Sequence, residues 1–169
     1  MMLTRRRMLA AALTLPAAAL MPAGLLQAQP SEAAERHTAV IHTDQGPHRL
    51  RVEVAHTPAG RAHGLMGRQH LGAERGMLFV YDRRQPATSA FWMYRTLIPL
   101  DIAFIDRDGR IVSLQTMPPC ESARSSECPA YAPGSGYYAA LEVNAGYFAD
   151  RGIREGDCIS SRVLDGRCQ

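Results

Sequence analysis

The chain has 169 residues, of which 46% are hydrophobic and 21% are charged, so it can bury the core of one domain but is too short for two ordinary ones. Its formal net charge of +3 belongs to the start of the chain, because Arg5, Arg6 and Arg7 come before any acidic residue and the remainder is balanced. A balanced remainder without a basic run predicts no nucleic-acid partner.

The first 28 residues have the pattern of an export signal. The three arginines precede an uncharged run from Met8 to Leu26 that is rich in Ala and Leu. The small residue Ala28 then offers a signal-peptidase cleavage site. The arginine pair after Thr4 also fits a twin-arginine signal, and the general secretory route is the alternative.

An uncleaved anchor is the other interpretation of this segment, since an apolar run of about 18 residues is long enough to span a bilayer. Pro16, Pro22 and the high Ala content favour cleavage. We therefore expect a signal at residues 1–28, a linker at 29–36 and one domain at 37–169, located in the periplasm or secreted. Contact with a membrane is expected only through the first segment, if it stays uncleaved.

The rest of the chain predicts a strand-rich domain. Leu50, Val52 and Val54 alternate with charged residues, which is typical of a strand with one buried face. By the same reasoning strands are expected at residues 38–43, 48–55, 77–81, 98–105, 110–117, 137–143 and 158–164. This order predicts a mainly β (α+β) fold, a compact antiparallel β-barrel-like or sandwich domain with two short helices.

The two helices have recognisable ends. Thr57-Pro58 predicts a helix start, because the Thr hydroxyl can cap free amides and Pro at the first helical position loses no needed hydrogen bond. Asn144 predicts the cap of a second helix over residues 145–151, and Gly152 suits the left-handed residue that ends it.

The stretch from Ser89 to Ser113 combines the only Trp of the chain with an acid in an apolar strand. In this strand Ile98, Leu100, Ile102 and Phe104 fall on one face, expected as core, while Pro99, Asp101, Ala103 and Ile105 fall on the other. Residues 106–109 predict a hairpin turn, and residues 118–135 form a long irregular loop of the kind that is often functional.

Four cysteines lie in the second half of the chain: Cys120, Cys128, Cys158 and Cys168. In an exported protein they favour structural disulfides over a redox or metal site, because no Cys-x-x-Cys motif is present. Three pairings are open. The local one would fix a loop and the tail rather than the core.

The region from about Val52 to Val163 resembles domain-of-unknown-function family 192. The matching residues are Thr57-Pro58, Arg61, Gly64-Leu65-Met66, Gly76 to Val80, Phe91-Trp92-Met93, Thr96, Ile98 to Asp101, Phe104-Ile105-Asp106, Gly109, Ile111-Val112, Leu141 to Gly146, Gly152-Ile153 and Gly156-Asp157. The resemblance implies a small, mainly β domain behind an export signal, and no established activity. The chain departs from the pattern at Tyr94-Arg95, in place of Lys-Asn, and at Gly60, in place of Glu.

Polar residues around the central hairpin are the candidate ligand-binding site. They are Arg61, Trp92, Arg95, Asp101, Glu142 and Asn144. Asp101 needs a partner if it is buried, and we expect Arg61, Arg95 or backbone amides to supply it. A purely structural pair is the competing interpretation.

Two further hypotheses are copper binding and hydrolysis. His63, Met66 and Met93 offer imidazole and thioether ligands for copper, although Met residues commonly fill cores. Asp101 and Glu142 would serve a hydrolase if they lay about 5 to 9.5 Å apart. The favoured hypothesis is a non-catalytic module that binds a small molecule or peptide without a cofactor.

Overall fold

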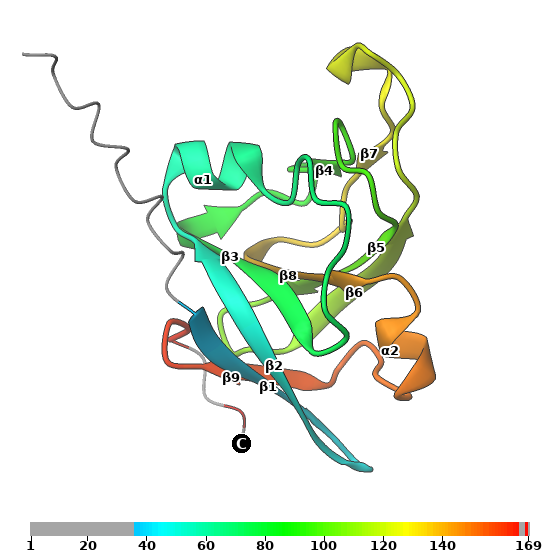
Figure 1. The fold of residues 1–169 in the computed structure, drawn as a ribbon. Helices are drawn as coiled ribbons and strands as arrows, with labels where there is room; N and C mark the ends of the chain where they lie inside the picture. The colour runs from blue at the N-terminus through cyan, green and yellow to red at the C-terminus, as the bar shows by residue number, and fades with distance from the viewer. Residues whose placement is uncertain (1–35, 166–167, 169) are drawn as a thin grey trace, which may run out of the picture. The chain divides into compact units, whose positions relative to one another are not determined.

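The computed structural model describes residues 36–165 and 168, and its fold is mainly β (Figure 1). The strands are β1 (Arg36–Thr43), β2 (Gly46–Ala55), β3 (Arg75–Gln85), β4 (Phe91–Trp92), β5 (Leu100–Ile105), β6 (Ile111–Met117), β7 (Ala130–Tyr131), β8 (Tyr137–Asn144) and β9 (Cys158–Ser161). The helices are α1 (Pro58–His63), the 3-10 helix η1 (Ser125–Glu127) and α2 (Tyr147–Asp150). The predicted signal at residues 1–28 lies outside the described residues, as does the predicted linker apart from Arg36.

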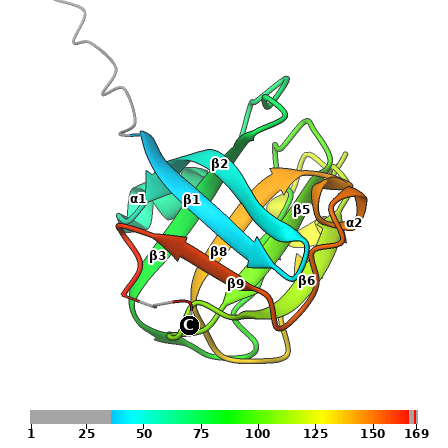
Figure 2. The ribbon, with the colours of Figure 1, turned by 90° about the horizontal axis from the view of Figure 1, so that it is seen from below.

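Seven strands form one curled sheet in the order β6-β5-β8-β3-β2-β1-β9, and β4 pairs with β7 separately (Figures 1 and 2). Backbone hydrogen bonds connect the starts of the two edge strands: Ile111 donates to Asp157 at 2.8 Å, and Ile159 donates to Gly109 at 2.7 Å. The sheet is therefore a half-barrel joined at one end, which confirms the β-barrel-like prediction. Among the described residues, no helix is long and apolar enough to cross a membrane.

One pair of strands departs from the antiparallel expectation. β2 and β3 run parallel, with Val52 opposite Gly76 and Ala55 opposite Phe79. Parallel neighbours need a connection that returns across the sheet, and here α1 and the loop after it make that return. The parallel pair thus explains why α1 lies beside the sheet.

Both faces of strand β5, which lies between β6 and β8, are buried, although only one is expected as core from the sequence. Leu100, Ile102 and Phe104 pack in the cluster that also contains Leu65, while Ala103 and Ile105 pack in a second cluster with β1, β2 and α2. The strand begins at Leu100 rather than residue 98. Pro99 explains this start, because it has no N–H to give to a neighbouring strand.

The helix ends follow local chemistry at α1 but not at α2. The Thr57 hydroxyl accepts from the Gly60 amide at 3.0 Å, as predicted. At α2 the predicted cap, Asn144, is wrong, because Gly146 occupies the N-cap position and no side chain caps there. Gly152, at φ +63°, does follow α2 as expected.

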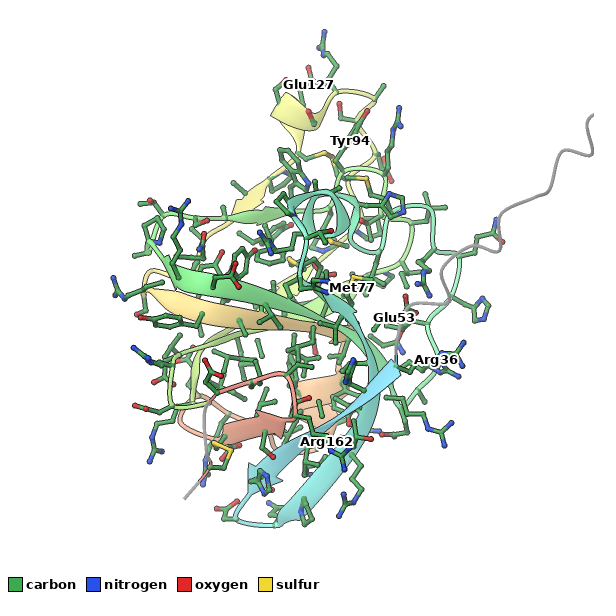
Figure 3. The ribbon with its side chains drawn as sticks, turned by 90° about the vertical axis from the view of Figure 1, so that its left-hand side faces the viewer. Arg36, Glu53, Met77, Tyr94, Glu127 and Arg162 are labelled. Carbon is green, nitrogen blue, oxygen red and sulfur yellow. A yellow bond between two sulfur atoms is a disulfide. The ribbon has the colours of Figure 1, made fainter. Side chains whose placement is uncertain are left out.

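Two disulfides confirm the structural interpretation of the cysteines, and they use the local pairing. Cys120 bonds to Cys128 and Cys158 to Cys168. The first lies in the long loop that carries η1 and leads into β7, at the end of the molecule where Tyr94 and Glu127 lie in Figure 3. The second lies toward the opposite end, which is also the end of Arg162. Two disulfides fit a non-cytoplasmic protein.

Candidate functional site

A cleft of about 330 Å³ lies between α1, β3 and β4. Its lining includes Arg61 and His63 from α1, Phe79 and Tyr81 from β3, Trp92 from β4 and Glu142 from β8. Three of the six predicted ligand residues, Arg61, Trp92 and Glu142, therefore share one cleft.

Glu142 is the buried acid of this cleft. Only 4% of its surface is exposed, and no hydrogen bond or ion pair reaches its carboxyl group from residues 36–165 and 168. Burial alone raises the pKa of Glu142 from 4.5 to about 8, because no cation offsets the lost hydration of the charged form. At neutral pH the group is mainly a neutral carboxylic acid.

The register of the sheet explains why this acid faces the cleft. Glu142 lies opposite Met77 on β3 and Ile102 on β5, so it shares their face. Gly76 lets β3 approach β8 closely at this point, because a Cβ there would stand 2.6 Å from the Glu142 carbonyl oxygen. The carboxyl position is therefore held by two hydrogen-bonded neighbouring strands.

Arg61 brings a positive charge to the same cleft. Its Nη1 donates to the carbonyls of His56 and Val80, at 2.6 and 3.0 Å. Its guanidinium carbon lies 4.7 Å from the centre of the Tyr81 ring. None of the described acidic residues forms a salt bridge with Arg61. The guanidinium is thus positioned by carbonyls and a ring, and its charge is not neutralised.

Aromatic rings supply the apolar walls. Phe79 and Phe91 meet edge to face with ring centres 4.9 Å apart. Tyr81 packs against Tyr137, and burial, followed by the neighbouring Tyr137, raises the pKa of Tyr81 well above its usual range. The side chain of Trp92 is 50% exposed, although tryptophan side chains are mostly buried in folded proteins. A cleft with rings and few polar groups is typical of small-molecule sites.

The other three predicted ligand residues are not in this cleft. Asp101 faces the opposite side of the sheet, where it accepts from the Thr116 hydroxyl at 2.7 Å and from the Phe148 amide at 3.4 Å. Its partners are thus a hydroxyl and one of the predicted backbone amides, not Arg61 or Arg95.

Asn144 and Arg95 contact other parts of the protein instead of the cleft. Asn144 donates to the carbonyls of Leu71 and Gly72, at 3.0 and 3.2 Å, and so fixes the loop before β3. Arg95 is exposed, stands over the Tyr94 ring at 5.1 Å, and has a φ of +56°. Neither side chain lines the cleft.

The residues considered for copper are only partly brought together. His63 and Met66 line the cleft, but Met93 is fully buried in the core and is not part of its lining. The described residues contain no group of three or more His, Cys, Asp or Glu side chains placed to hold a metal. The pairing of Asp101 with Glu142 that a hydrolase needs is also not formed, because the two lie on opposite faces.

Sequence reasoning missed Phe79 and Tyr81 as site residues. Both belong to the apolar run at residues 77–81, which predicts a strand but does not indicate which face lines a site. The available signal was their alternation: residues 77, 79 and 81 share a face, and that face is the one α1 returns over. Only the parallel β2–β3 pairing, which brings α1 over this face, distinguishes it from the other face of the strand.

A second cavity of about 470 Å³ lies near the β5–β6 turn. Asp82, Arg83, Arg84, Asp106 and Arg107 are among its lining residues, so both charges are present in the same place. Its acids and bases are exposed or half-buried, and no buried unpartnered group marks a ligand position. The cleft beside α1 is therefore the better candidate.

Comparison with known proteins gives a family and two solved structures. The model of family DUF192, described as Uncharacterized ACR, matches residues 39–161. A protein of Sinorhizobium meliloti 1021 proposed as a transcription regulator is 30% identical, with a TM-score of 0.67 over 78% of this chain and 97% of that one. A protein of unknown function from Novosphingobium aromaticivorans DSM 12444 is 32% identical, with a TM-score of 0.65 over 78% and 89%. No curated protein matches the chain.

Proposed function

The chain belongs to domain-of-unknown-function family 192, and from this premise we propose that it is an exported, non-catalytic module that binds a small organic molecule in the cleft beside α1. The observation that carries the proposal is the carboxyl group of Glu142, which has no hydrogen-bond partner among the described residues and lies in the wall of a cleft lined by both aromatic and polar side chains. A buried polar group without a partner costs free energy, and a ligand that supplies the partner recovers it.

The cleft suits binding better than hydrolysis. Acid and base catalysis on a glycoside needs two carboxyl groups on either side of the bond. Glu142 is the acidic residue of the cleft lining, and Asp101 faces away. A peptide ligand remains an outcome of the experiment below, since the exposed Trp92 could also contact a longer molecule.

Export is part of the same proposal. The two disulfides and the signal-like residues 1–28 support a periplasmic or secreted location after cleavage. We do not extend the regulator role suggested for the S. meliloti protein to this chain, because its acidic and basic residues balance beyond Arg7. Copper binding through His63 and Met66 is tested separately by metal analysis of protein from its native compartment.

The single tryptophan makes the proposal testable without a label. Because Trp92 lines the cleft, its emission should change when a compound binds there. The full chain is screened against anionic, neutral and cationic small molecules and short peptides, and hits are measured by calorimetry. The proposal is wrong if no compound of any class binds to the folded protein.

Two alanines of α1 provide a matched pair of variants. Ala62 is exposed and lines the cleft, whereas Ala59 is also exposed on the same helix but does not line the cleft. Filling the cleft with Ala62→Phe should weaken binding at least about tenfold, which is roughly 1.4 kcal/mol. Ala59→Phe should leave the affinity unchanged. Equal effects of the two variants would place the ligand elsewhere.

A further inference from the structure

We propose that the ligand of the α1 cleft carries a carboxylate on an apolar body, bound between the guanidinium of Arg61 and the carboxyl group of Glu142. This inference rests on the proposed function and names its ligand class. Arg61 and Glu142 both line this cleft but do not form an ion pair with each other.

Arg61 supplies the attraction for an anion. Its Nη1 is engaged by two carbonyls, but Nε and Nη2 have no hydrogen bond within the described residues, and no acid there pairs with it. A guanidinium has donors in a fixed fork that match a carboxylate. The carbonyls of His56 and Val80 hold the group in place before any ligand arrives, so little side-chain entropy is lost on binding.

Glu142 supplies a donor rather than a second charge. Only 4% of the surface of Glu142 is exposed, no cation of the described residues forms an ion pair with it, and the raised pKa of about 8 keeps it protonated at pH 7. A neutral carboxylic acid has one O–H to donate. Hydrogen bonds to an ionised acceptor are about twice as strong as neutral ones, so a ligand carboxylate is a good partner for this O–H.

The remaining lining residues fit the apolar body of such a ligand. Around Glu142, the facing neighbours in the sheet are Met77 and Ile102, which are apolar. The other titratable side chains of the cleft are His63 on α1 and Tyr81 on β3, and the phenol of Tyr81 stays neutral because burial raises its pKa. With Glu142 protonated, the guanidinium of Arg61 gives the cleft a permanent positive charge, which repels a cationic amine.

Three compounds of nearly the same size test the charge of the ligand. Phenylacetate is an anion, phenylacetamide is neutral and 2-phenylethylamine is a cation. Binding of each to the full chain is measured at pH 7 by calorimetry and by the emission of Trp92. We expect phenylacetate to bind at least about tenfold more tightly than either of the others. Tightest binding of the amine would overturn the proposal and point to an ionised Glu142 as its partner.

The pH dependence tests the role of Glu142. Above its pKa the carboxyl group becomes an anion and repels the ligand, so the affinity for phenylacetate should fall about tenfold between pH 7 and pH 9. Glu142→Gln keeps a donor and cannot ionise, so it should bind at pH 7 and lose the alkaline decline. The profile is repeated in His63→Gln, because His63 lines the same cleft. An unchanged alkaline decline in E142Q contradicts the proposal.

The role of Arg61 is tested by Arg61→Met. Affinity for phenylacetate should fall at least about tenfold, while affinity for phenylacetamide changes much less. Because Arg61 also bonds to two carbonyls, the E142Q profile provides an arm that does not depend on the docking of α1. If another class of compound binds in the cleft and phenylacetate does not, the ligand class is wrong but the proposed function stands. If nothing binds, both fail.

Discussion

Asp101 and Glu142 lie on hydrogen-bonded neighbouring strands, yet their side chains occupy opposite faces of the sheet. Asp101 is opposite Val143, the residue after Glu142, and side chains alternate along a strand. Each acid is 4% exposed, but Asp101 has two donors and Glu142 has none among the described residues. Asp101 therefore holds the fold, while Glu142 is the acid that we propose as a ligand contact.

This difference predicts separate effects for the two acids. Asp101→Asn weakens two hydrogen bonds to a buried carboxylate, so the free energy of unfolding should fall by about 1–3 kcal/mol. Ligand affinity should not change, because residue 101 faces away from the cleft. Urea denaturation and calorimetry measure the two quantities. Lost affinity at unchanged stability would show that our assignment of Asp101 is wrong.

Glu142 makes stability depend on pH in a direction that is unusual for an acid. Its pKa is 4.5 when hydrated and about 8 in the fold, so between these values the unfolded chain loses a proton that the folded chain retains. Unfolding becomes easier as pH rises, by about 1.4 kcal/mol per pH unit over that window, and the effect levels off above pH 8. Below pH 4.5 both states are protonated and the contribution vanishes.

Glu142→Gln removes this contribution. The unfolding free energy of wild type minus that of the variant should therefore decline from pH 5 to pH 8. Glu121→Gln, which changes an exposed acid, is the matched control and should follow the wild type. Denaturation at each pH gives the comparison. Parallel curves for wild type and E142Q would mean that Glu142 is ionised and stabilised in the fold.

Much of the fold follows from local chemistry. Alternation along residues 50–54 and the Thr57-Pro58 start identified β2 and α1, and the hairpin at 106–109 joins β5 to β6. Two residues long, β4 and β7 are too short to give a periodic signal. The parallel β2–β3 pairing depends on the path of a loop, which side-chain patterns do not encode.

The site was predictable only as a set of residue types. Arg61, Trp92 and Glu142 line one cleft, whereas Arg95, Asp101 and Asn144, which the sequence predicts together with them as polar residues around the central hairpin, do not. Asp101 reaches a helix amide through the folded sheet, a contact between residues 47 positions apart. Tertiary contacts of that kind decide which polar residue has a partner.

Removal of one disulfide should affect the cleft, whereas removal of the other should not. Trp92 pairs with Ala130 in the β4–β7 ladder, and Cys128 stands just before that strand. Replacing Cys120 and Cys128 by Ser should lower the free energy of unfolding by about 2–3 kcal/mol and reduce the fluorescence anisotropy of Trp92, because the loop leading to β7 loses its constraint.

Replacement of Cys158 and Cys168 by Ser is the matched control. That bond closes a loop of similar length, with a sequence separation of 10 instead of 8, but it lies at the start of β9 and away from Trp92. We expect a comparable loss of stability with unchanged anisotropy. The same change of anisotropy in both double variants would show that global stability, and not the β4–β7 ladder, controls Trp92.

Gly76 provides a test of how the sheet positions Glu142. A Cβ at residue 76 would stand 2.6 Å from the Glu142 carbonyl oxygen and 3.1 Å from Cγ1 of Val143, so β3 and β8 must move apart in Gly76→Ala. We expect about 1–3 kcal/mol of lost stability from this overpacking and weaker ligand binding, since the carboxyl moves with its strand. Gly72→Ala is the control, because its nearest neighbour is Cγ of the flexible Arg75 side chain at 3.0 Å. It should cost little stability and leave binding intact. If G76A loses stability but keeps full affinity, the backbone contact does not set the position of the carboxyl group.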